Sequence, residues 1–419
     1  MIDLRRLRDE PDYRAGIERK RVRPGLLDEL TALADRHHAL DLEVEARRAE
    51  RNAASKAIGQ ADPADRPAKI AAAGELKERL DGLEAEFAAA GEAMQELALL
   101  VPNPADPSVP DGGEDDGAVV REVGERNDAP ALDHAAFGEG LGWVETRQAV
   151  EMSGTRFAYL QGGAVLLEFA LVSWVMSTLV REGFTPVVPP VLVRERALVE
   201  AGFFPTDRNQ VYALPDDELF LVGTSEVPLS ALRRGETLPV ESLPQRFVGY
   251  SPCFRREAGT HGRDTRGIFR VHQFDKVEMF SYADPDDSWS ELDALLAVEE
   301  SIVGGLGLPY RVVNIAAGDL GNPAAKKFDL EVWLPSEGRY RELTSCSNYL
   351  DYSARRLGTR VKGPDGSRYL HTLNGTACAI GRTLLFLFEH HQIDGGAALE
   401  VPEVLQPFVG CDILRGVDA

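Results

Sequence analysis

Charged and aromatic side chains gather in two short stretches of the sequence, residues 253–257 and residues 271–280. The first stretch reads Cys-Phe-Arg-Arg-Glu and the second reads Val-His-Gln-Phe-Asp-Lys-Val-Glu-Met-Phe. We interpret them as two strands joined by a polar loop. Because side chains alternate across a strand, we expect one charged face that carries Arg255, Glu257, Phe274, Lys276 and Glu278.

Such a face could lie on a surface hairpin with cross-strand ion pairs, or it could line a cleft. The strands carry apolar residues at their other positions and lie in the middle of a domain, which favours a cleft. Arg255 and Arg270 suit phosphate, because a guanidinium stays charged and offers a planar fork of donors. The ring of Phe274 offers a surface on which a base can stack. These residues alone predict a phosphate-and-base site.

A third arginine, Arg382, lies in the first turn of an apolar stretch, residues 381–392, that we predict to be a buried helix. A cation at this end opposes the helix dipole, so its presence favours an anion nearby, and a bound phosphate would serve. The alternative is an arginine that simply reaches solvent.

The size and composition of the chain limit what can position these residues. A length of 419 residues favours two domains, and a net charge of -22 restricts any contact with RNA to local cation patches. The four cysteines form no CxxC pair, which argues against a zinc site and a disulfide framework. We find no signal peptide and no membrane span, so the expected location is the cytoplasm.

Two long helices are predicted near the N-terminus, because apolar residues recur at alternating four- and three-residue spacing. A breaker segment, residues 59–67, separates them, so they should fold back on each other as an antiparallel coiled-coil arm, about 26–98. Each helix would span about 45 Å. The seam consists of Leu26, Leu30, Leu33, His37, Leu40 and Val44, then Leu76, Leu80, Leu83, Phe87, Ala90, Met94 and Leu97.

Such an arm could be a dimerisation coiled coil or could bind RNA. A basic cluster near its tip, consisting of Arg47, Arg48, Arg51 and Lys56, favours a phosphate backbone, although acidic residues are interspersed. We expect a first domain at 1–105, a Pro-, Gly- and acid-rich linker at 106–131 and a second domain at 132–419. In the second domain, helices alternate with paired strands, which predicts an α+β fold with a mainly antiparallel sheet flanked by helices.

Several motifs together resemble one family. Residues 183–190, 254–257 and 381–383 occur in the order and spacing of the three signature motifs of class II aminoacyl-tRNA synthetases. With residues 224–226, 262–267, 272–278, 342–348 and 373–376, they resemble the bacterial seryl-tRNA synthetases, and the resemblance covers essentially the whole chain. It implies the class II catalytic fold, with a tRNA-binding first domain.

The resemblance also implies site residues. Arg255 would hold the α-phosphate of ATP and the serine carboxylate, while Arg382 and Phe274 sandwich the adenine, and both arginines would be catalytic. The implied ATP-binding residues are Arg255, Arg256, Glu257, Arg270, Val271, Phe274, Glu342, Leu343, Thr344, Ser345 and Arg382. The implied serine-binding residues are Thr224, Ser225, Glu226, Glu278 and Thr376. Glu342 and Ser345 would bind Mg²⁺ rather than zinc, since both offer oxygen ligands.

The implied reaction activates serine with ATP to give seryl-adenylate and diphosphate, and then transfers the seryl group to the 3′ end of tRNA-Ser, with tRNA-Sec as a further candidate. Adenylation needs positioning and charge neutralisation more than a general base. The loop 258–268, with Arg263 and Arg266, would guide the acceptor end, and the arm would hold the long variable arm of the tRNA.

A homodimer is implied by the resemblance of residues 166–193 to the family's dimer element. Pro189 and Pro190 cannot belong to a central strand, so we expect an edge or interface position. Two departures from the family pattern are Arg256, where a small residue is common, and Thr376, where serine is common. Three alternatives remain: a paralogue that loads a carrier protein, which would lack the arm; an inactive homologue; and a duplicated copy that serves antibiotic biosynthesis or resistance.

Overall fold

A computed structural model describes residues 1–259 and 266–416 of the chain. The described residues form two compact units, Met1–Pro102 and Asn103–Ala419. Each unit buries apolar residues of its own.

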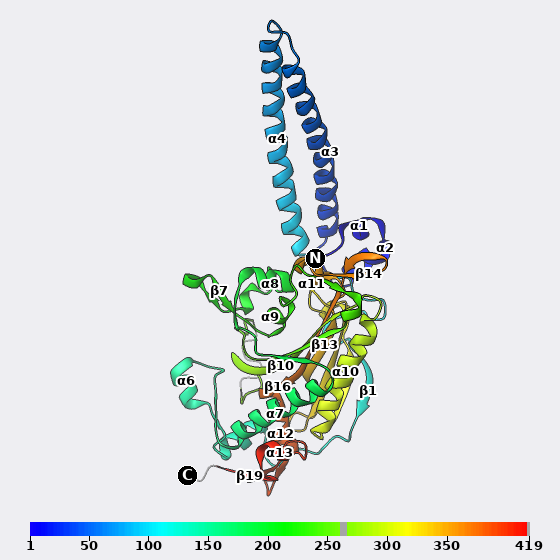
Figure 1. Ribbon diagram of the computed structural model, residues 1–419. Helices are drawn as coiled ribbons and strands as arrows, with labels where there is room; N and C mark the ends of the chain where they lie inside the picture. The colour runs from blue at the N-terminus through cyan, green and yellow to red at the C-terminus, as the bar shows by residue number, and fades with distance from the viewer. Residues whose placement is uncertain (260–265, 417–419) are drawn as a thin grey trace. The chain divides into compact units, whose positions relative to one another are not determined.

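The first unit is a helical hairpin preceded by two short helices. Helices α1 (Leu4–Asp9) and α2 (Pro11–Glu18) lead into α3 (Leu26–Gly59), and α4 (Arg66–Leu99) returns beside it. Figure 1 shows α3 and α4 as two long, antiparallel helices. The predicted arm is confirmed, and its helices turn between Gly59 and Arg66, where the breaker residues lie.

The predicted seam lies between the two helices of the hairpin. Leu30, Leu40, Val44, Leu80 and Ala90 are buried there. His37 takes an apolar position in the seam because its ring stacks on Phe87, with centroids 4.3 Å apart. The hairpin is therefore held by the apolar stripe that the spacing predicts.

An eight-stranded sheet forms the centre of the second unit, in the order β1-β11-β12-β13-β16-β10-β9-β4. All neighbouring pairs are antiparallel except β4 with β9. The prediction of a mainly antiparallel sheet is confirmed. The strands are β1 (Ala118–Val123), β4 (Thr185–Val187), β9 (Gln245–Phe254), β10 (Gln273–Ala283), β11 (Tyr310–Asn314), β12 (Lys326–Leu334), β13 (Arg339–Asn348) and β16 (His371–Ala379).

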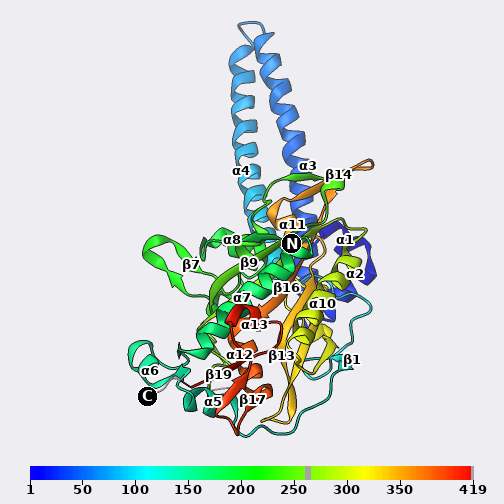
Figure 2. The same cartoon turned by 60° about the horizontal axis from the view of Figure 1, so that its bottom comes forward.

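Three helices, α7 (Gly163–Arg181), α10 (Ser288–Gly305) and α12 (Ile380–His390), pack against this sheet (Figure 2). Their apolar residues join the largest hydrophobic cluster together with β10, β12 and β16. Helix α7 is long and apolar enough to cross a membrane by composition alone. One of its faces is fully buried in the core through Leu167, Leu171 and Val175, as in a core helix.

Smaller elements surround the sheet. The remaining helices are α5 (His134–Gly140), α6 (Arg147–Ser153), α8 (Glu195–Ala201), α9 (Glu226–Ser230), α11 (Tyr352–Leu357) and α13 (Gln406–Val409). The remaining strands are β2 (Val144–Glu145), β3 (Tyr159–Leu160), β5 (Leu192–Arg194), β6 (Ala213–Leu214), β7 (Leu219–Leu221), β8 (Thr237–Pro239), β14 (Arg360–Gly363), β15 (Gly366–Tyr369), β17 (Gln392–Ile393), β18 (Ala398–Glu400) and β19 (Ile413–Arg415).

Two segments differ from the sequence-based expectations. The segment expected to be a linker, 106–131, contains β1, which pairs with β11 at the sheet edge, and Val109 is buried in a small apolar cluster. The first charged strand ends at Phe254, so Arg255 and Glu257 lie beyond it rather than on its face. Glu257 has a φ of 49°, which is incompatible with a continuing strand.

The start of α7 supplies a test of the core packing. A Cβ atom on Gly163 would lie 2.3 Å from Cζ2 of Trp143, whose side chain is fully buried. We expect Gly163→Ala to destabilise the protein by about 1–3 kcal/mol through overpacking. Gly304→Ala in α10 is the control, since nothing lies within 4 Å of its Cβ position and alanine favours helix. Urea denaturation measures both; equal stability of the two variants would contradict this packing.

Candidate active site

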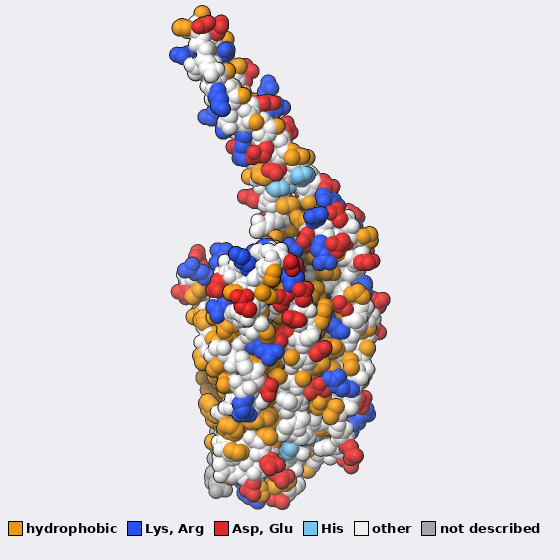
Figure 3. Space-filling view, turned by 45° about the vertical axis from the view of Figure 1, so that its right-hand side comes forward, with side chains coloured by type: hydrophobic (Ala, Val, Ile, Leu, Met, Phe, Trp, Pro, Cys, Tyr) orange, Lys and Arg blue, Asp and Glu red, His pale blue; other side chains and the backbone are white. Residues whose placement is uncertain are grey.

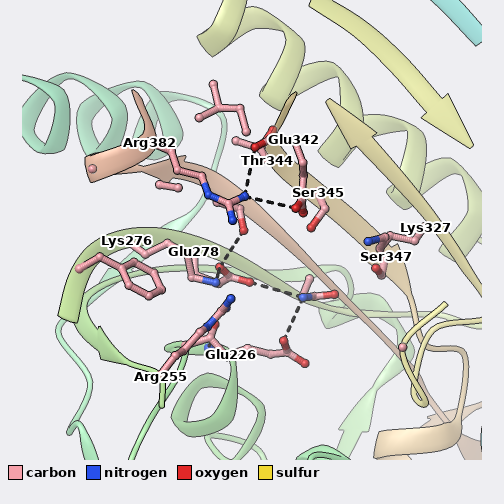
Figure 4. Close-up of a pocket in the computed structure, with 18 of the residues that line it drawn as sticks. Glu226, Arg255, Lys276, Glu278, Lys327, Glu342, Thr344, Ser345, Ser347 and Arg382 are labelled. Atoms are coloured by element: carbon pink, nitrogen blue, oxygen red, sulfur yellow. Dashed lines mark hydrogen bonds and ion pairs between the residues drawn. The ribbon is translucent and has the colours of Figure 1, made fainter. Parts of the chain in front are cut away.

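A cavity of about 390 Å³ lies on the central sheet of the second unit. Figure 4 shows charged side chains from several strands pointing into it. Most of the predicted site residues line it, namely Thr224, Glu226, Arg255, Glu257, Arg270, Val271, Phe274, Glu278, Glu342, Leu343, Thr344, Ser345, Thr376 and Arg382. The charged face predicted from strand alternation is therefore the wall of a cleft and not a surface hairpin.

Two predicted residues are absent from the described lining. Ser225 is fully buried next to the cavity, and its hydroxyl has no hydrogen-bond partner among the described residues. The backbone N–H of Arg256 donates to the carbonyl oxygen of Gln210 at 2.8 Å, and its guanidinium lies 6.0 Å from the ring of Tyr212. Arg256 is thus directed toward a neighbouring loop instead of the cavity.

The predicted acceptor loop is described only at its two ends. Residues 260–265, which include Arg263, lie outside the described residues. Arg266 pairs with Asp133 at 3.2 Å and is mostly exposed. The structure therefore locates the base of this loop beside α5.

One end of the cavity is a buried polar pocket. Glu278 on β10 lies opposite Thr376 on β16, and the threonine hydroxyl donates to Glu278 Oε2 at 3.3 Å. The amide nitrogen of Asn374 donates to Glu226 Oε2 at 3.0 Å and to Glu278 Oε1 at 3.4 Å. Lys276 forms an ion pair with Glu278 from the same face of β10. Two carboxylates and one ammonium group thus share a site that is almost closed to solvent.

This crowding changes the acidity of Glu226. Burial, followed by the nearby charge of Glu278, raises the pKa of Glu226 to about 8. Burial also raises the pKa of Tyr349 well above its ordinary value, and the Glu226 carboxylate adds to this effect. A small ligand with an ammonium group would favour the ionised form of Glu226 and would pair with it.

The other end of the cavity combines an aromatic ring with arginines. The Arg255 guanidinium lies 5.2 Å from the Phe274 ring centre, and its Nε donates to the carbonyl oxygen of Gly223 at 3.2 Å. Arg270 Nη1 donates to Glu257 Oε2 at 2.6 Å. These contacts hold one guanidinium group beside an aromatic ring and a second against a carboxylate on the same cavity wall, an arrangement that suits a nucleotide.

The anion expected near Arg382 is a carboxylate of the protein itself. Arg382 Nη1 lies 3.2 Å from Glu342 Oε2 and donates to the Glu342 carbonyl oxygen at 3.1 Å. Desolvation would raise the pKa of Glu342, but the charges of Arg382 and Lys327 outweigh it and lower the pKa to about 2. Glu342 therefore remains an anion at every physiological pH.

The residues present fit a magnesium ion that is bound together with phosphates. Glu342 and Ser345 offer a carboxylate and a hydroxyl on the same cavity wall. Among the residues the structure describes, no three His, Cys, Asp or Glu side chains are grouped to hold a metal. Magnesium commonly takes one or two protein ligands and completes its shell with phosphate and water, so this sparse set suits it.

Sequence reasoning did not assign roles to Lys276, Lys327, Tyr349 or Asn374, all of which line the cavity. Alternation along β10 had already placed Lys276 on the charged face. Asn374 belonged to a quoted motif, but its bridge between two carboxylates depends on β16 lying beside β10. Lys327 pairs with Asp329 on β12 at 3.1 Å, and no sequence motif pointed to it.

The raised pKa of Glu226 makes a prediction about stability. Its folded pKa of about 8 exceeds its ordinary value of 4.5, so the folded state loses stability as pH rises between these values. We expect Glu226→Gln to remove this loss, so that the variant gains stability over the parent from pH 5 to pH 8. Urea unfolding across this range measures it, with the exposed Glu241→Gln as control. If the free energy of unfolding changes with pH in the same way for the parent and for Glu226→Gln, the prediction is contradicted.

Comparisons with known proteins identify the family of this chain. The sequence model of the seryl-tRNA synthetase N-terminal domain matches residues 1–105, and that of the tRNA synthetase class II core domain (G, H, P, S and T) matches residues 211–391. The serine–tRNA ligase of Thermobifida fusca is 45% identical over 100% of this chain and 99% of its own length. That of Acidothermus cellulolyticus is 45% identical over 99% of both chains.

Solved structures extend the similarity to the fold. The crystal structure of the seryl-tRNA synthetase from Pyrococcus horikoshii, complexed with ATP, has a TM-score of 0.93 and 33% identity, with both chains fully covered. The cytoplasmic serine–tRNA ligase from Naegleria fowleri, in complex with AMP, has a TM-score of 0.89 and 29% identity over 100% of this chain and 99% of its own. Because the relatives match along the full length and both domain models match, this chain belongs to the seryl-tRNA synthetase family.

Proposed function

We propose that this cavity activates serine with ATP and then transfers the seryl group to tRNA. The observation that carries the proposal is the division of one cavity into a buried pocket with two carboxylates and an adjoining arginine-rich end with an aromatic ring. A zwitterionic amino acid and a nucleotide are the two ligands that match these ends.

Serine would lie in the polar pocket. Its ammonium group would face Glu226 and Glu278, its hydroxyl would meet Thr376 and Glu278, and Thr224 would close the pocket. Its carboxylate would point to Arg255. Alanine would leave these buried groups unpaired and would bind much more weakly, whereas threonine keeps the hydroxyl and can be excluded only by pocket size.

ATP would lie at the arginine-rich end. The adenine would stack between Phe274 and Arg382, with Glu257 and the backbone near Val271 at its edge. Arg255 would hold the α-phosphate, while Arg270 and Arg382 draw the tail phosphates back. Mg²⁺ held by Glu342 and Ser345 would neutralise phosphate charge. The relative from Pyrococcus horikoshii was solved in complex with ATP, which supports ATP as the nucleotide.

The chemical step needs no general base from the protein. A serine carboxylate oxygen attacks the α-phosphorus, and the bond between the α-phosphorus and the bridging oxygen breaks, with its electron pair leaving on diphosphate. Arg255 would neutralise the charge that develops at the α-phosphate. The ribose hydroxyl at the 3′ end of tRNA would then take the seryl group and release AMP.

The helical hairpin of the first unit would hold tRNA by its backbone. Its cations are largely paired: Arg47 contacts Glu50 and Arg48 contacts Glu45 and Glu84. Figure 3 shows basic and acidic side chains interspersed along the hairpin. RNA binding would exchange these exposed pairs, which contribute little to stability, for contacts with phosphate, so binding should weaken steeply with salt.

A second copy of the chain would cover the outer face of α7. This face exposes Leu166, Phe169 and Val180, and Val188 beyond it is 82% exposed. Large apolar residues exposed along one helix face favour a protein contact, which supports the homodimer that the family resemblance implies. We also propose a cytoplasmic location, where tRNA is charged.

The most direct test of the function is serine-dependent exchange between ATP and diphosphate, run beside transfer of serine to tRNA-Ser. We expect both activities with magnesium present. Absence of exchange would contradict the enzyme assignment. Exchange without transfer would favour loading of a carrier protein, although the N-terminal unit argues for tRNA.

Thr376 supplies a test of serine recognition. Thr376→Ser keeps the hydroxyl that contacts Glu278, so we expect KM for serine to stay within about threefold of the parent. Thr376→Val keeps the shape but loses the hydroxyl, which should raise KM for serine about 10- to 100-fold, since a buried polar partner is lost. Initial exchange rates measure both variants. Equal KM values for serine in the parent and in Thr376→Val would contradict a role for Thr376 in serine binding.

A further inference from the structure

The first turn of helix α5 contacts the residues that end the predicted acceptor loop, 258–268. The Arg266 guanidinium lies 3.2 Å from Asp133 Oδ2, and Gly267 packs against the ring of His134. A Cβ atom on Gly267 would lie 2.8 Å from both Cδ2 and Nε2 of that ring. Gly267 also has a φ of 66°, which glycine adopts without strain. The base of the loop therefore rests on α5 so closely that no side chain fits between them.

A buried carboxylate fixes the His134 ring in this position. Glu389, near the end of α12, accepts from His134 Nδ1 at 2.8 Å and from the His134 backbone N–H at 3.0 Å. The hydroxyl and the backbone N–H of Ser336 donate to the same carboxylate at 2.7 and 3.0 Å. Burial would raise the pKa of Glu389, but these hydrogen bonds outweigh it and lower the pKa below its ordinary value. Because an ionised carboxylate only accepts, His134 Nδ1 carries a proton and the ring cannot turn over without losing this bond.

The other nitrogen of the ring faces the loop base. His134 Nε2 is buried and has no hydrogen-bond partner among the described residues. Buried polar atoms of this kind are uncommon, and a phenyl ring at this position would pack against Gly267 without one. The imidazole is explained by its bond to Glu389, which fixes the plane of the ring beneath the loop.

Both ends of the loop 258–268 are held by described residues. At the first end, the Gln210 side chain accepts from the backbone N–H of Ala258 at 3.0 Å and donates to its carbonyl oxygen at 3.1 Å. At the second end, Ile268 and the next residue, Phe269, are buried in the largest hydrophobic cluster and line the cavity. The contact of Gly267 with α5 directly precedes this buried segment. It therefore sets the direction in which the chain leaves the cavity wall.

We infer that His134 and Asp133 are positioning residues for the transfer of serine to tRNA. The inference rests on the proposed function, in which the loop 258–268 guides the acceptor end. In that step a ribose oxygen bonds to the seryl carbonyl carbon and its proton passes to solvent, while the bond from this carbon to phosphate breaks and its electron pair leaves on AMP. Such a reaction is sensitive to displacements of about 1 Å. Adenylation needs the contact less, because neither residue is among the described residues that line the cavity.

The inference predicts a loss in one of the two steps. His134→Ala should lower kcat for transfer about fivefold to tenfold, while exchange between ATP and diphosphate and KM for serine stay within about twofold. His134→Asn keeps a donor for Glu389 but removes the ring beneath Gly267. It should therefore recover thermal stability but not transfer. A merely structural role of His134 would let His134→Asn recover both.

A double-variant cycle tests the contact without any activity. Gly267→Ala should lower the urea midpoint, because its Cβ atom meets a ring that Glu389 holds in place. Adding His134→Ala opens this space, so the double variant should be at least as stable as Gly267→Ala alone. Gly410→Ala is the control for backbone strain, since Gly410 has a φ of 86° and nothing lies within 4 Å of its Cβ position. It should leave the ratio of transfer to exchange unchanged.

The outcomes separate this inference from the proposed function. A parent protein without exchange or transfer would contradict the proposed function itself. In an active parent, normal transfer by His134→Ala would overturn the inference, and so would an equal loss of exchange and transfer. Losses of stability that simply add in the double variant would overturn the contact on which the inference depends.

Discussion

The site depends on the burial of two carboxylates, Glu226 and Glu278, with a single ammonium group, Lys276, beside them. Isolated charges in a protein interior are costly, so a group of this kind persists only when it is paired and hydrogen-bonded. Asn374 bridges the two acids and Thr376 donates to one of them. An arriving ammonium group favours the ionised form of Glu226, and the pocket is complementary to an amino group because this ionisation supplies the balancing negative charge.

At the nucleotide end of the cavity, the charged groups that need partners are cations instead of carboxylates. Arg270 and Arg382 contact Glu257 and Glu342, so each guanidinium has an anionic partner without a ligand present. In the proposed mode of binding, phosphates would replace carboxylates as the partners of arginines whose positions are already fixed. Such preorganised charge is what adenylation requires, because the reaction redistributes negative charge among phosphate oxygens.

Local patterns in the sequence predicted much of this arrangement. Alternation placed Phe274, Lys276 and Glu278 on one face, and heptad spacing predicted the helical hairpin, including His37 in its seam. Alternation failed beyond Phe254, because the backbone turns there and Glu257 takes a positive φ. Alternation also did not predict β1, because the residues of this strand are exposed on both faces and show no apolar period.

Long-range contacts could not be predicted in this way. The bridge made by Asn374 requires β16 to lie beside β10, and the contact between Arg382 and Glu342 requires β13 to pass near the start of α12. Such contacts follow from strand order, which a local pattern does not encode. The family resemblance supplied the residues of the serine and ATP motifs, while the structure supplied their partners.

Serine binding followed by calorimetry at pH 7, in two buffers of different ionisation enthalpy, tests the central claim most directly. With a pKa of about 8, Glu226 is mostly protonated at this pH, and an arriving ammonium group favours its ionised form. The account predicts that the parent protein releases close to one proton for each serine bound and that Glu226→Gln releases none. Serine binding by the parent without proton release would contradict it.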